Sequence, residues 1–256
     1  MILGINDMAD PSVSLVKNGQ LIFYIEEERL NRVKHSHNIF PIRSIKAALK
    51  YYNISFNEIE YIAYNWNFKK YENGSMENFF RRLNKEYNSD VATKKWQRER
   101  LKKRNLENFK KKVFLNLKKN FNIKKLPKIK FYSHHYVHAF QSHYQSGFKN
   151  SICITIDGSG EENCTVVWKF ENGKHTKLEE INMPHSLGWY FAAFTEYLGF
   201  KAYDGEYKLM GLASYGKYIP ELEAKIEKIL KFDNKSSYRI DPQFIHYGKH
   251  SYSGRF

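Results

Sequence analysis

Cysteine and long apolar segments are scarce in this chain of 256 residues. The two cysteines, Cys153 and Cys164, are too few for a disulfide framework, so we expect free thiols in a reducing cytoplasm. No apolar run approaches the roughly 20 residues that span a membrane. Residues 1–11 also lack the basic and apolar segments of a signal peptide. The sequence therefore argues against a disulfide-stapled secreted domain and against a membrane protein.

Acidic residues are scarce between residues 68 and 130. This segment holds 21 Lys and Arg against 6 Asp and Glu, so it accounts for the net charge of +15 and leaves the rest neutral. Aromatic residues are interleaved with the basic ones, and the segment reads as helical. Binding of a nucleic acid or nucleotide through 68–130 is one interpretation. A solvated or partner-binding helical arm is the other.

The N-terminal part has the pattern of a β-meander followed by a helix. Residues 2–6 form an apolar strand, and 13–29 form a hairpin around the two-residue turn Asn18-Gly19. A helix is predicted from 41 to 52 and a further strand over 59–66. Strand, hairpin, helix and strand in this order predict a ribonuclease-H-like lobe, in which a parallel strand follows three antiparallel ones.

A second copy of the meander begins at Ser151. A strand that ends at Asp157 is followed by a hairpin with an Asn172-Gly173 turn. Two copies predict an α/β protein with duplicated, actin-like lobes. We expect a first lobe from 1–66 and 127–150, a basic helical insert over 67–126, and an incomplete second lobe over 151–256.

Four histidines lie in the segment HHYVHAFQSHY, residues 134–144. On a helix, His134 and His138 share one face, and the strand that ends at Asp157 offers a carboxylate. Two imidazoles and a carboxylate form a ligand set that favours iron(II) and accepts zinc or manganese. The alternative is a polar helix whose histidines are solvated or hydrogen-bonded.

A glycine-rich turn follows Asp157. The backbone N–H groups of Gly158, Ser159 and Gly160 can approach an anion such as a phosphate. The same dipeptides also mark ordinary hairpin turns. The charged stretch 26–36, EEERLNRVKHS, lies at the end of a strand near the mouth of the first lobe, and a solvated face is its simplest interpretation.

The segment DGEYKLMGLASYG, residues 204–216, places charged residues beside a short apolar patch. Lys208 is a candidate phosphate partner, and Glu206 is a candidate acceptor for a ribose hydroxyl or a nucleophile. The alternative is a loop, too short for a regular element, that packs through Met210 and Leu212 and exposes its charges.

Taken in order, several of these segments resemble one family over nearly the whole chain except the basic insert. The resemblance is to the O-carbamoyltransferases of nodulation and of tobramycin, cephamycin and novobiocin biosynthesis. It is carried by GIN, DPSVSLVKNGQ, IEEERLNRVKH, SHHYVHAFQSHY, ITIDGSGE, MPHSLGWYFAAFTEYLGF and DGEYKLMGLASYG.

The resemblance implies a specific chemistry. Members use ATP and carbamoyl phosphate to make carbamoyl-adenylate, and the actin-like domain then passes the carbamoyl group to a hydroxyl with the help of iron. Carried over by motif, His134, His138 and Asp157 would be the metal ligands, and Lys208 would lie near the adenylate.

The chain departs from the family in two ways. The family's first strand is normally followed by His-Asp, the histidine being the expected base, whereas this chain has Ala9-Asp10. Asp10 and Lys208 are then the candidate catalytic residues. Members also continue for several hundred residues, so we expect a second polypeptide to supply the rest of the second lobe and the adenylate-forming domain. A split-gene half, a degenerate copy and a fragment are the explanations we consider.

Two other functions stay open. The chain could be a non-catalytic nucleotide-binding or regulatory subunit, since alanine cannot take a proton. A tRNA threonylcarbamoyl-type transferase ranks third, because that family usually shows HxExH and this chain has Tyr136 in place of the glutamate. The acceptor would be a small molecule or a nucleotide.

Overall fold

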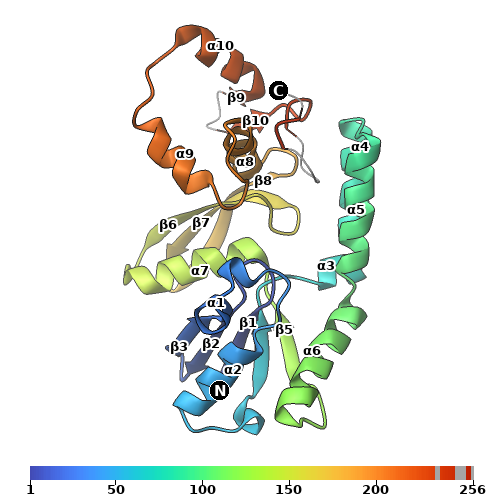
Figure 1. Cartoon of the computed structure of the whole chain (residues 1–256), viewed down its shortest axis with the longest axis vertical. Helices are drawn as coiled ribbons and strands as arrows, with labels where there is room; N and C mark the ends of the chain where they lie inside the picture. Colours follow the sequence, from blue (N-terminus) through green and yellow to red (C-terminus); the bar gives the residue numbers. More distant parts are fainter. Residues whose placement is uncertain (234–236, 246–251, 255–256) are drawn as a thin grey trace. The chain divides into compact units, whose positions relative to one another are not determined.

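The first sheet has five strands in the order β3-β2-β1-β4-β5. The computed structural model describes residues 1–233, 237–245 and 252–254 (Figure 1). As predicted, the antiparallel meander comes first and the parallel strands follow. Asn18 and Gly19 close the hairpin with positive φ angles of 52° and 78°, which suits a tight two-residue turn. The strands are β1 (Ile2–Asn6), β2 (Ser12–Lys17), β3 (Gln20–Glu26), β4 (Tyr61–Tyr64) and β5 (Lys128–Phe131).

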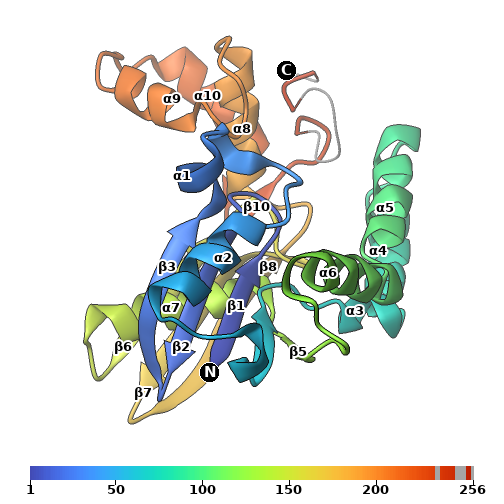
Figure 2. The same cartoon turned by 60° about the horizontal axis from the view of Figure 1, so that its bottom comes forward.

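Two helices cover one face of this sheet. Alternate residues of β1 and β2, such as Leu3 and Val13, are buried against α2 (Ile42–Tyr51) and α6 (Leu106–Phe121). Figure 2 shows α2 crossing the strands. The short elements α1 (Glu27–Asn31), η1 (Lys34–Ser36) and η2 (Phe56–Glu58) complete the layer. The alternation in the strands and the helical spacing in α2 and α6 therefore meet in one apolar core.

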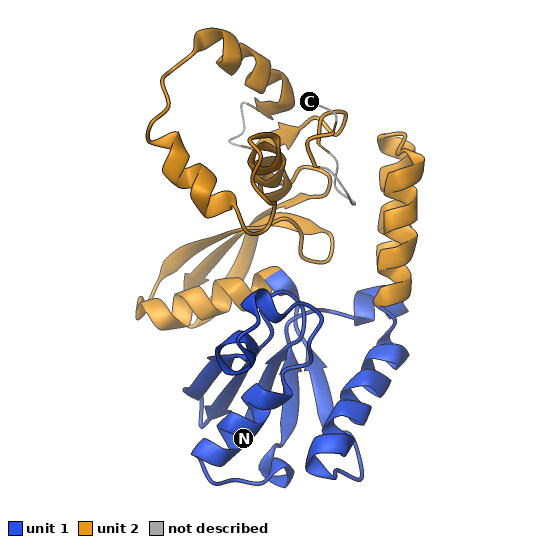
Figure 3. Cartoon of the chain, in the orientation of Figure 1, with its two compact units in different colours: residues 1–73, 104–134 blue, residues 74–103, 135–256 orange. Residues whose placement is uncertain are grey.

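The lysine-rich segment is helical, and its helices divide between two units. It forms α3 (Lys69–Glu72), α4 (Ser75–Glu86), α5 (Val91–Lys103) and α6. By their contacts the residues divide into unit 1, which is 1–73 and 104–134, and unit 2, which is 74–103 and 135–256 (Figure 3). The helices α3 and α6 thus belong to unit 1, and α4 and α5 to unit 2. The lobe and insert boundaries expected from the sequence stay a proposal.

One lysine of the basic segment holds α6 to the sheet of unit 1. Asp7 follows β1 and is almost fully buried, and Lys112 Nζ donates to its Oδ2 at 2.6 Å. Tyr64 on β4 donates its hydroxyl to the same carboxylate. Burial, followed by the charge of Asp7, raises the pKa of Tyr64 well above its usual value, so this phenol stays protonated and remains a donor.

The second sheet is an antiparallel meander in unit 2. Its strands are β6 (Ser151–Ile156), β7 (Asn163–Glu171) and β8 (Lys174–Asn182), with left-handed Asn172 and Gly173 at the β7–β8 turn. The helix α7 (His134–Ser146) begins at the last residue of unit 1, and its buried face, which includes His135 and His143, packs on this sheet. A helix, α8 (Leu187–Tyr197), and a pair of short strands, β9 (Leu230–Phe232) and β10 (Tyr238–Ile240), follow.

The segment after Gly205 corrects one prediction. The alternative interpretation was a loop that packs through Met210 and Leu212. Residues 206–213 instead form the helix α9 (Glu206–Ala213), on which both of these side chains are exposed, and α10 (Pro220–Ile229) follows. Glu206 begins α9 and its side chain accepts from the backbone N–H of Tyr203 at 2.8 Å, which stabilises the turn before the helix. Among the described residues, no helix is both long enough and apolar enough to cross a membrane.

Candidate active site

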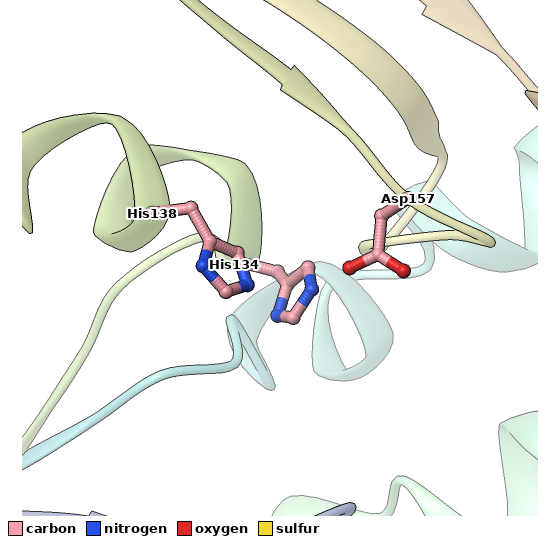
Figure 4. Close-up of side chains that lie close together, drawn as sticks. All are labelled: His134, His138 and Asp157. Atoms are coloured by element: carbon pink, nitrogen blue, oxygen red, sulfur yellow. The ribbon is translucent and has the colours of Figure 1, made fainter. Parts of the chain in front are cut away.

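Two histidines of α7 and one aspartate form the group that the sequence predicts as metal ligands. One donor atom each from His134, His138 and Asp157 lie within 4.8 Å of one another. Figure 4 shows the two imidazoles side by side and the carboxylate facing them. The boundary between the units falls directly after His134, but His134 and His138 are one turn apart on one helix, so the helix itself fixes their separation.

The other two histidines of α7 are structural. His135 is buried, and its two ring nitrogens make hydrogen bonds to Thr155 Oγ1 at 2.8 Å and to the carbonyl of Asn163 at 3.0 Å. His143 makes a hydrogen bond to Ser151 Oγ at 2.8 Å and stacks on Phe170. These contacts fasten α7 to the sheet of unit 2 and so hold His138 over the end of β6.

Asp157 is fixed by the turn that it begins. Its backbone N–H donates to the carbonyl of Cys164 at 2.9 Å, and its Oδ1 accepts from the N–H of Gly158 at 2.6 Å. The buried hydroxyl of Ser186, at the N-terminus of α8, donates to the carbonyls of Asp157 and Gly158 at 3.1 and 2.7 Å. A Cβ on Gly188 would lie 2.8 Å from the carbonyl oxygen of Asp157. Only glycine at 188 allows this close approach.

The donor set fits a transition metal. Two imidazoles and one carboxylate suit iron(II), zinc or manganese, and three protein ligands leave coordination positions for a substrate. His138 is exposed, and His134 and Asp157 are half-buried, so a ligand can reach the group from solvent. The three side chains could therefore hold such an ion.

A pocket of about 200 Å³ lies beside Asp157 in unit 2. Arg100 of α5 forms one side of it, stacking over Trp96 at 5.0 Å and donating to Ser159 Oγ at 3.1 Å. The same guanidinium donates to the carbonyls of Gly160 at 2.5 Å and Glu161 at 3.2 Å. The pocket is lined by Trp96, Arg100, Asp157, Gly158, Ser159, Trp189, Tyr203 and Tyr252.

Aromatic side chains form the other side of this pocket. Trp96 and Trp189 meet edge to face with ring centroids 6.0 Å apart. Trp189 Nε1 donates to the hydroxyl of Tyr203 at 3.2 Å, and that hydroxyl lies 2.7 Å from the hydroxyl of Tyr252. Burial raises the pKa of Tyr252, and a phenol titrates near pH 10 even in water. Both phenols are therefore neutral at pH 7 and offer hydrogen bonds without charge.

The glycine-rich turn is more engaged than the sequence implies. The N–H of Gly158 donates to Asp157, and the N–H of Gly160 donates to the carbonyl of Asn163 at 2.8 Å. Gly158 and Ser159 line the pocket, whereas the carbonyl of Gly160 accepts a hydrogen bond from Arg100 and Gly160 is not among the lining residues. The turn therefore presents one side to a ligand rather than a full ring of N–H groups.

The remaining candidates lie elsewhere. Lys208 is exposed on α9, and it is not among the residues that line the pocket. Glu206 accepts from the backbone of Tyr203, so its contact with the pocket is indirect. Asp10 lies in unit 1 after β1, where it meets His35 and Glu28, with one donor atom of each within 4.8 Å of the others.

Sequence reasoning did not assign roles to Trp96, Arg100 or His35. Trp96 and Arg100 are four residues apart and therefore share a face of α5, but their charge-rich surroundings are typical of a solvated helix. His35 lies inside the stretch EEERLNRVKHS, whose simplest interpretation was a solvated face. Arg100 contacts residues 159–161 and His35 contacts Asp10, so their positions depend on residues that lie far from them in the sequence.

Comparisons with known proteins give a consistent family. A family described as Carbamoyltransferase N-terminus matches residues 1–252. An uncharacterized protein of Synechocystis sp., sll1178, is 33% identical over 258 residues, which cover 96% of this chain and 39% of that protein. Nodulation protein NolNO of Sinorhizobium fredii is 32% identical over 234 residues, covering 91% of this chain and 31% of that protein.

The chain spans only part of its relatives. An uncharacterized protein of Methanocaldococcus jannaschii, MJ1051, is 28% identical over 216 residues, and the matched region is 33% of that protein. These three relatives are therefore matched over about a third to two fifths of their length. Among solved structures, YeaZ from Pseudomonas aeruginosa matches over 72% of this chain and 67% of that chain, with a TM-score of 0.38 and 11% identity.

Proposed function

The chain belongs to the family described as Carbamoyltransferase N-terminus, and we propose that it performs the transfer of a carbamoyl group from carbamoyl-adenylate to an acceptor hydroxyl. The observation that carries this proposal is the group of His134, His138 and Asp157, whose donor atoms lie within 4.8 Å of one another. Carbamoyl phosphate would be the source of the carbamoyl group and ATP the source of the adenylate. Iron(II), zinc or manganese bound there would polarise a phosphoryl or carbonyl oxygen of the carbamoyl-adenylate.

The pocket beside Asp157 would hold the adenylate. Trp96 and Trp189 offer apolar ring surfaces and the neutral phenols of Tyr203 and Tyr252 offer hydrogen bonds. Arg100 keeps the glycine-rich turn in place and adds positive charge next to the site of the phosphate. Gly158, Ser159 and Gly160 remain the proposed phosphate-binding turn. Glu206 and Lys208 remain proposed adenylate contacts. For Lys208 this contact requires α9 to move toward the pocket when the adenylate binds.

Metal analysis tests this proposal directly. The wild-type chain should bind Fe(II), Zn²⁺ or Mn²⁺ at a ratio of one ion per chain. His138→Ala should weaken binding by more than roughly 100-fold, because it removes a direct ligand rather than a supporting contact. Binding should also weaken below about pH 6.5, where free imidazoles protonate.

The matched control for this experiment is His175→Ala. His175 is an exposed histidine of β8 in the same unit, so its removal should leave the stoichiometry and affinity unchanged. Equal affinity in the His138→Ala and His175→Ala chains would rule out the ligand assignment. Circular dichroism of both variants would show that each is folded.

We further propose that a second polypeptide segment completes the sheet of unit 2 in a duplicated, actin-like fold. The meander β6-β7-β8 repeats β1-β2-β3, with an Asn-Gly turn in each. In unit 1, β1 pairs with β2 on one side and with β4 on the other. Its counterpart β6 pairs with β7 alone among the described residues and is therefore an edge strand. Ile152, Ile154 and Ile156 of β6 are each more than half exposed, and such a row on an edge strand is a binding surface.

One observation favours a second candidate, a non-catalytic nucleotide-binding or regulatory subunit. Ala9 precedes Asp10 where a proton acceptor is expected, and alanine has none. The metal and pocket residues would then bind an adenylate without turning it over. Binding of carbamoyl-adenylate or ATP without carbamoyl transfer, measured with wild-type chain and a full set of substrates, would favour this candidate.

A further inference from the structure

A histidine and an aspartate of unit 1 form a hydrogen-bonded pair outside the metal group. His35 Nδ1 lies 2.8 Å from Asp10 Oδ1. An ionised carboxylate only accepts, so Nδ1 carries the proton, and Nε2 is the basic nitrogen of the neutral ring. The His35 side chain is 25% exposed and that of Asp10 is 52% exposed, so solvent and a substrate can reach the pair.

The backbone around His35 is held in an uncommon conformation. The N–H of His35 donates to Glu28 Oε2 at 2.7 Å, and the buried hydroxyl of Ser36 donates to the carbonyl of Val33 at 2.9 Å. Asp10, His35 and Ser36 all have positive φ angles, of 51°, 59° and 38°. Residues other than glycine rarely adopt positive φ angles, and they do so where surrounding contacts fix the backbone. These contacts fix the backbone of His35, and the hydrogen bond to Asp10 orients its ring.

The pair lies at a functional edge of the sheet of unit 1. Asp10 follows β1, His35 follows β3, and His134 follows β5. In the order β3-β2-β1-β4-β5 these three strands run in the same direction. Their carboxyl ends therefore lie at one edge, which is where α/β sheets collect ligands. His35 and Asp10 thus share an edge with one of the candidate metal ligands of the chain.

We propose that His35 is the general base for the acceptor hydroxyl and that Asp10 is its positioning residue, an inference that rests on the proposed carbamoyl transfer. Nε2 of His35 takes the proton of the hydroxyl as the oxygen forms its bond to the carbamoyl carbon. The bond between that carbon and the phosphate oxygen breaks, and its electron pair leaves with AMP. The imidazolium then gives its proton to solvent. Ala9 has no group that could take this proton.

The test compares His35→Ala, Asp10→Asn and His37→Asn in the full chain, together with any polypeptide needed for activity. Transfer of labelled carbamoyl from carbamoyl-adenylate to glycerol, used as a hydroxyl probe, is measured with and without added imidazole. His35→Ala should lower kcat by about 100-fold or more, the contribution of a general base, and free imidazole should restore part of the rate. Asp10→Asn should lower kcat less and leave KM unchanged.

His37→Asn is the matched control, because His37 is an exposed histidine of the same loop that stacks on His35. It should change the rate by less than about threefold. The ¹⁵N shifts of the His35 ring should report an Nδ1–H tautomer in the wild type, and Asp10→Asn should shift its population.

Three results decide between the explanations. A wild-type chain that binds metal and transfers no carbamoyl group would count against the proposed function as well as the base. Transfer that is equal in the wild type and His35→Ala would overturn the base while leaving the proposed function intact. Loss of a second metal ion in His35→Ala would also overturn it, because Asp10, Glu28 and His35 would then be a metal site.

Discussion

At the scale of single residues, the face of α7 that a histidine occupies decides what it does. His135 points into the sheet of unit 2, where both ring nitrogens are used in hydrogen bonds. His134 and His138 lie on another face, where Asp157 meets them. A buried imidazole with two partners cannot also coordinate a metal ion, so these contacts exclude His135 from the candidate metal group.

Glycine 188 is the residue on which the position of Asp157 depends most directly. A Cβ at this position would lie about 2.5 Å from the carbonyl carbon of Asp157 and 2.8 Å from its oxygen. Gly188→Ala should therefore push α8 away from the turn, lower the free energy of unfolding by about 1–3 kcal/mol, and weaken metal binding. Urea unfolding and metal titration measure the two effects.

Gly211→Ala provides the control for this prediction. Gly211 lies in α9, and nothing lies within 4 Å of its hypothetical Cβ. Alanine is the better helix former by about 1 kcal/mol, so this variant should be as stable as the wild type or more stable. An unfolding free energy for Gly188→Ala that matches that of Gly211→Ala would contradict the close approach.

The closeness of His134, His138 and Asp157 could be predicted from the sequence, and the pocket could not. The spacing of His134 and His138 is set by one helix, and Asp157 follows the carboxyl end of a strand, which is where α/β sheets collect ligands. Arg100 instead binds a turn that is some sixty positions away in the chain. Its charge-rich neighbours give no sign that this one guanidinium is half-buried, because the contact is tertiary.

At the scale of elements, turn chemistry made the two meanders predictable. Asn18-Gly19 and Asn172-Gly173 mark the turns of the two hairpins. The register shifts within β2–β3 and β7–β8 were not predictable from these turns. The helix α9 was missed because its apolar residues are not buried against other elements, so it lacks the periodic core pattern that predicts a helix. The division of the lysine-rich helices between two units was also not predictable, because local propensity does not specify a partner.

His185 joins three elements of unit 2. Its Nε2 lies 3.0 Å from the hydroxyl of Tyr87, which follows α4, and its Nδ1 lies 2.9 Å from the carbonyl of Ile240 in β10. Burial lowers the pKa of this imidazole, the hydrogen bond to Ile240 opposes this shift, and the charge of Arg239 contributes to it. The folded protein therefore binds this proton less readily than the unfolded chain does.

This shift predicts a pH dependence of stability. In the unfolded chain the imidazole titrates near pH 6.5. The contribution of neutral His185 to the free energy of unfolding is therefore fully present above that pH, and it is lost as the pH falls through the lower pKa of the folded state. His185→Asn should remove this part of the acid destabilisation. Thermal unfolding between pH 8 and 5 measures it, and parallel curves for wild type and variant would contradict the prediction.

At the scale of the whole molecule, the positive charge is concentrated in α3 to α6 and in the residues that follow α6. Several of its cations have contacts within their own unit, among them Arg100 on the 159–161 turn, Arg104 over the ring of Trp66, and Lys112 on Asp7. Many of the others are exposed. These exposed side chains are the part of the segment that could bind a polyanion.

Salt titration tests this possibility. If α6 binds nucleic acid, the double variant Lys110→Glu and Lys111→Glu should weaken binding of single-stranded DNA and flatten its salt dependence. These two lysines are exposed. The matched double variant Lys225→Glu and Lys228→Glu in α10 should have a smaller effect. Absence of binding by the wild type at low salt would remove the polyanion interpretation and leave a helical arm that is solvated or binds a protein.

The exposed row on β6 gives a prediction about association. The part of the Synechocystis relative that lies beyond its matched region should bind this chain, and Ile154→Lys should abolish binding because it places a charge in an apolar interface. Leu178→Lys is the control, since Leu178 is exposed to a similar extent on β8. Sedimentation of mixtures measures the complex. Equal binding by both variants would show that β6 is not the interface.

The way the chain is divided has a further consequence for its covalent topology. Each unit consists of two separate stretches, and the chain passes between units at 73–74, 103–104 and 134–135 (Figure 3). A single proteolytic cut anywhere in the chain therefore leaves at least one unit divided between fragments or still tethered to the other. Three cuts, one at each crossing, are needed to separate the units, and each unit then consists of two fragments. A terminal deletion that removes every residue of one unit therefore also removes part of the other unit.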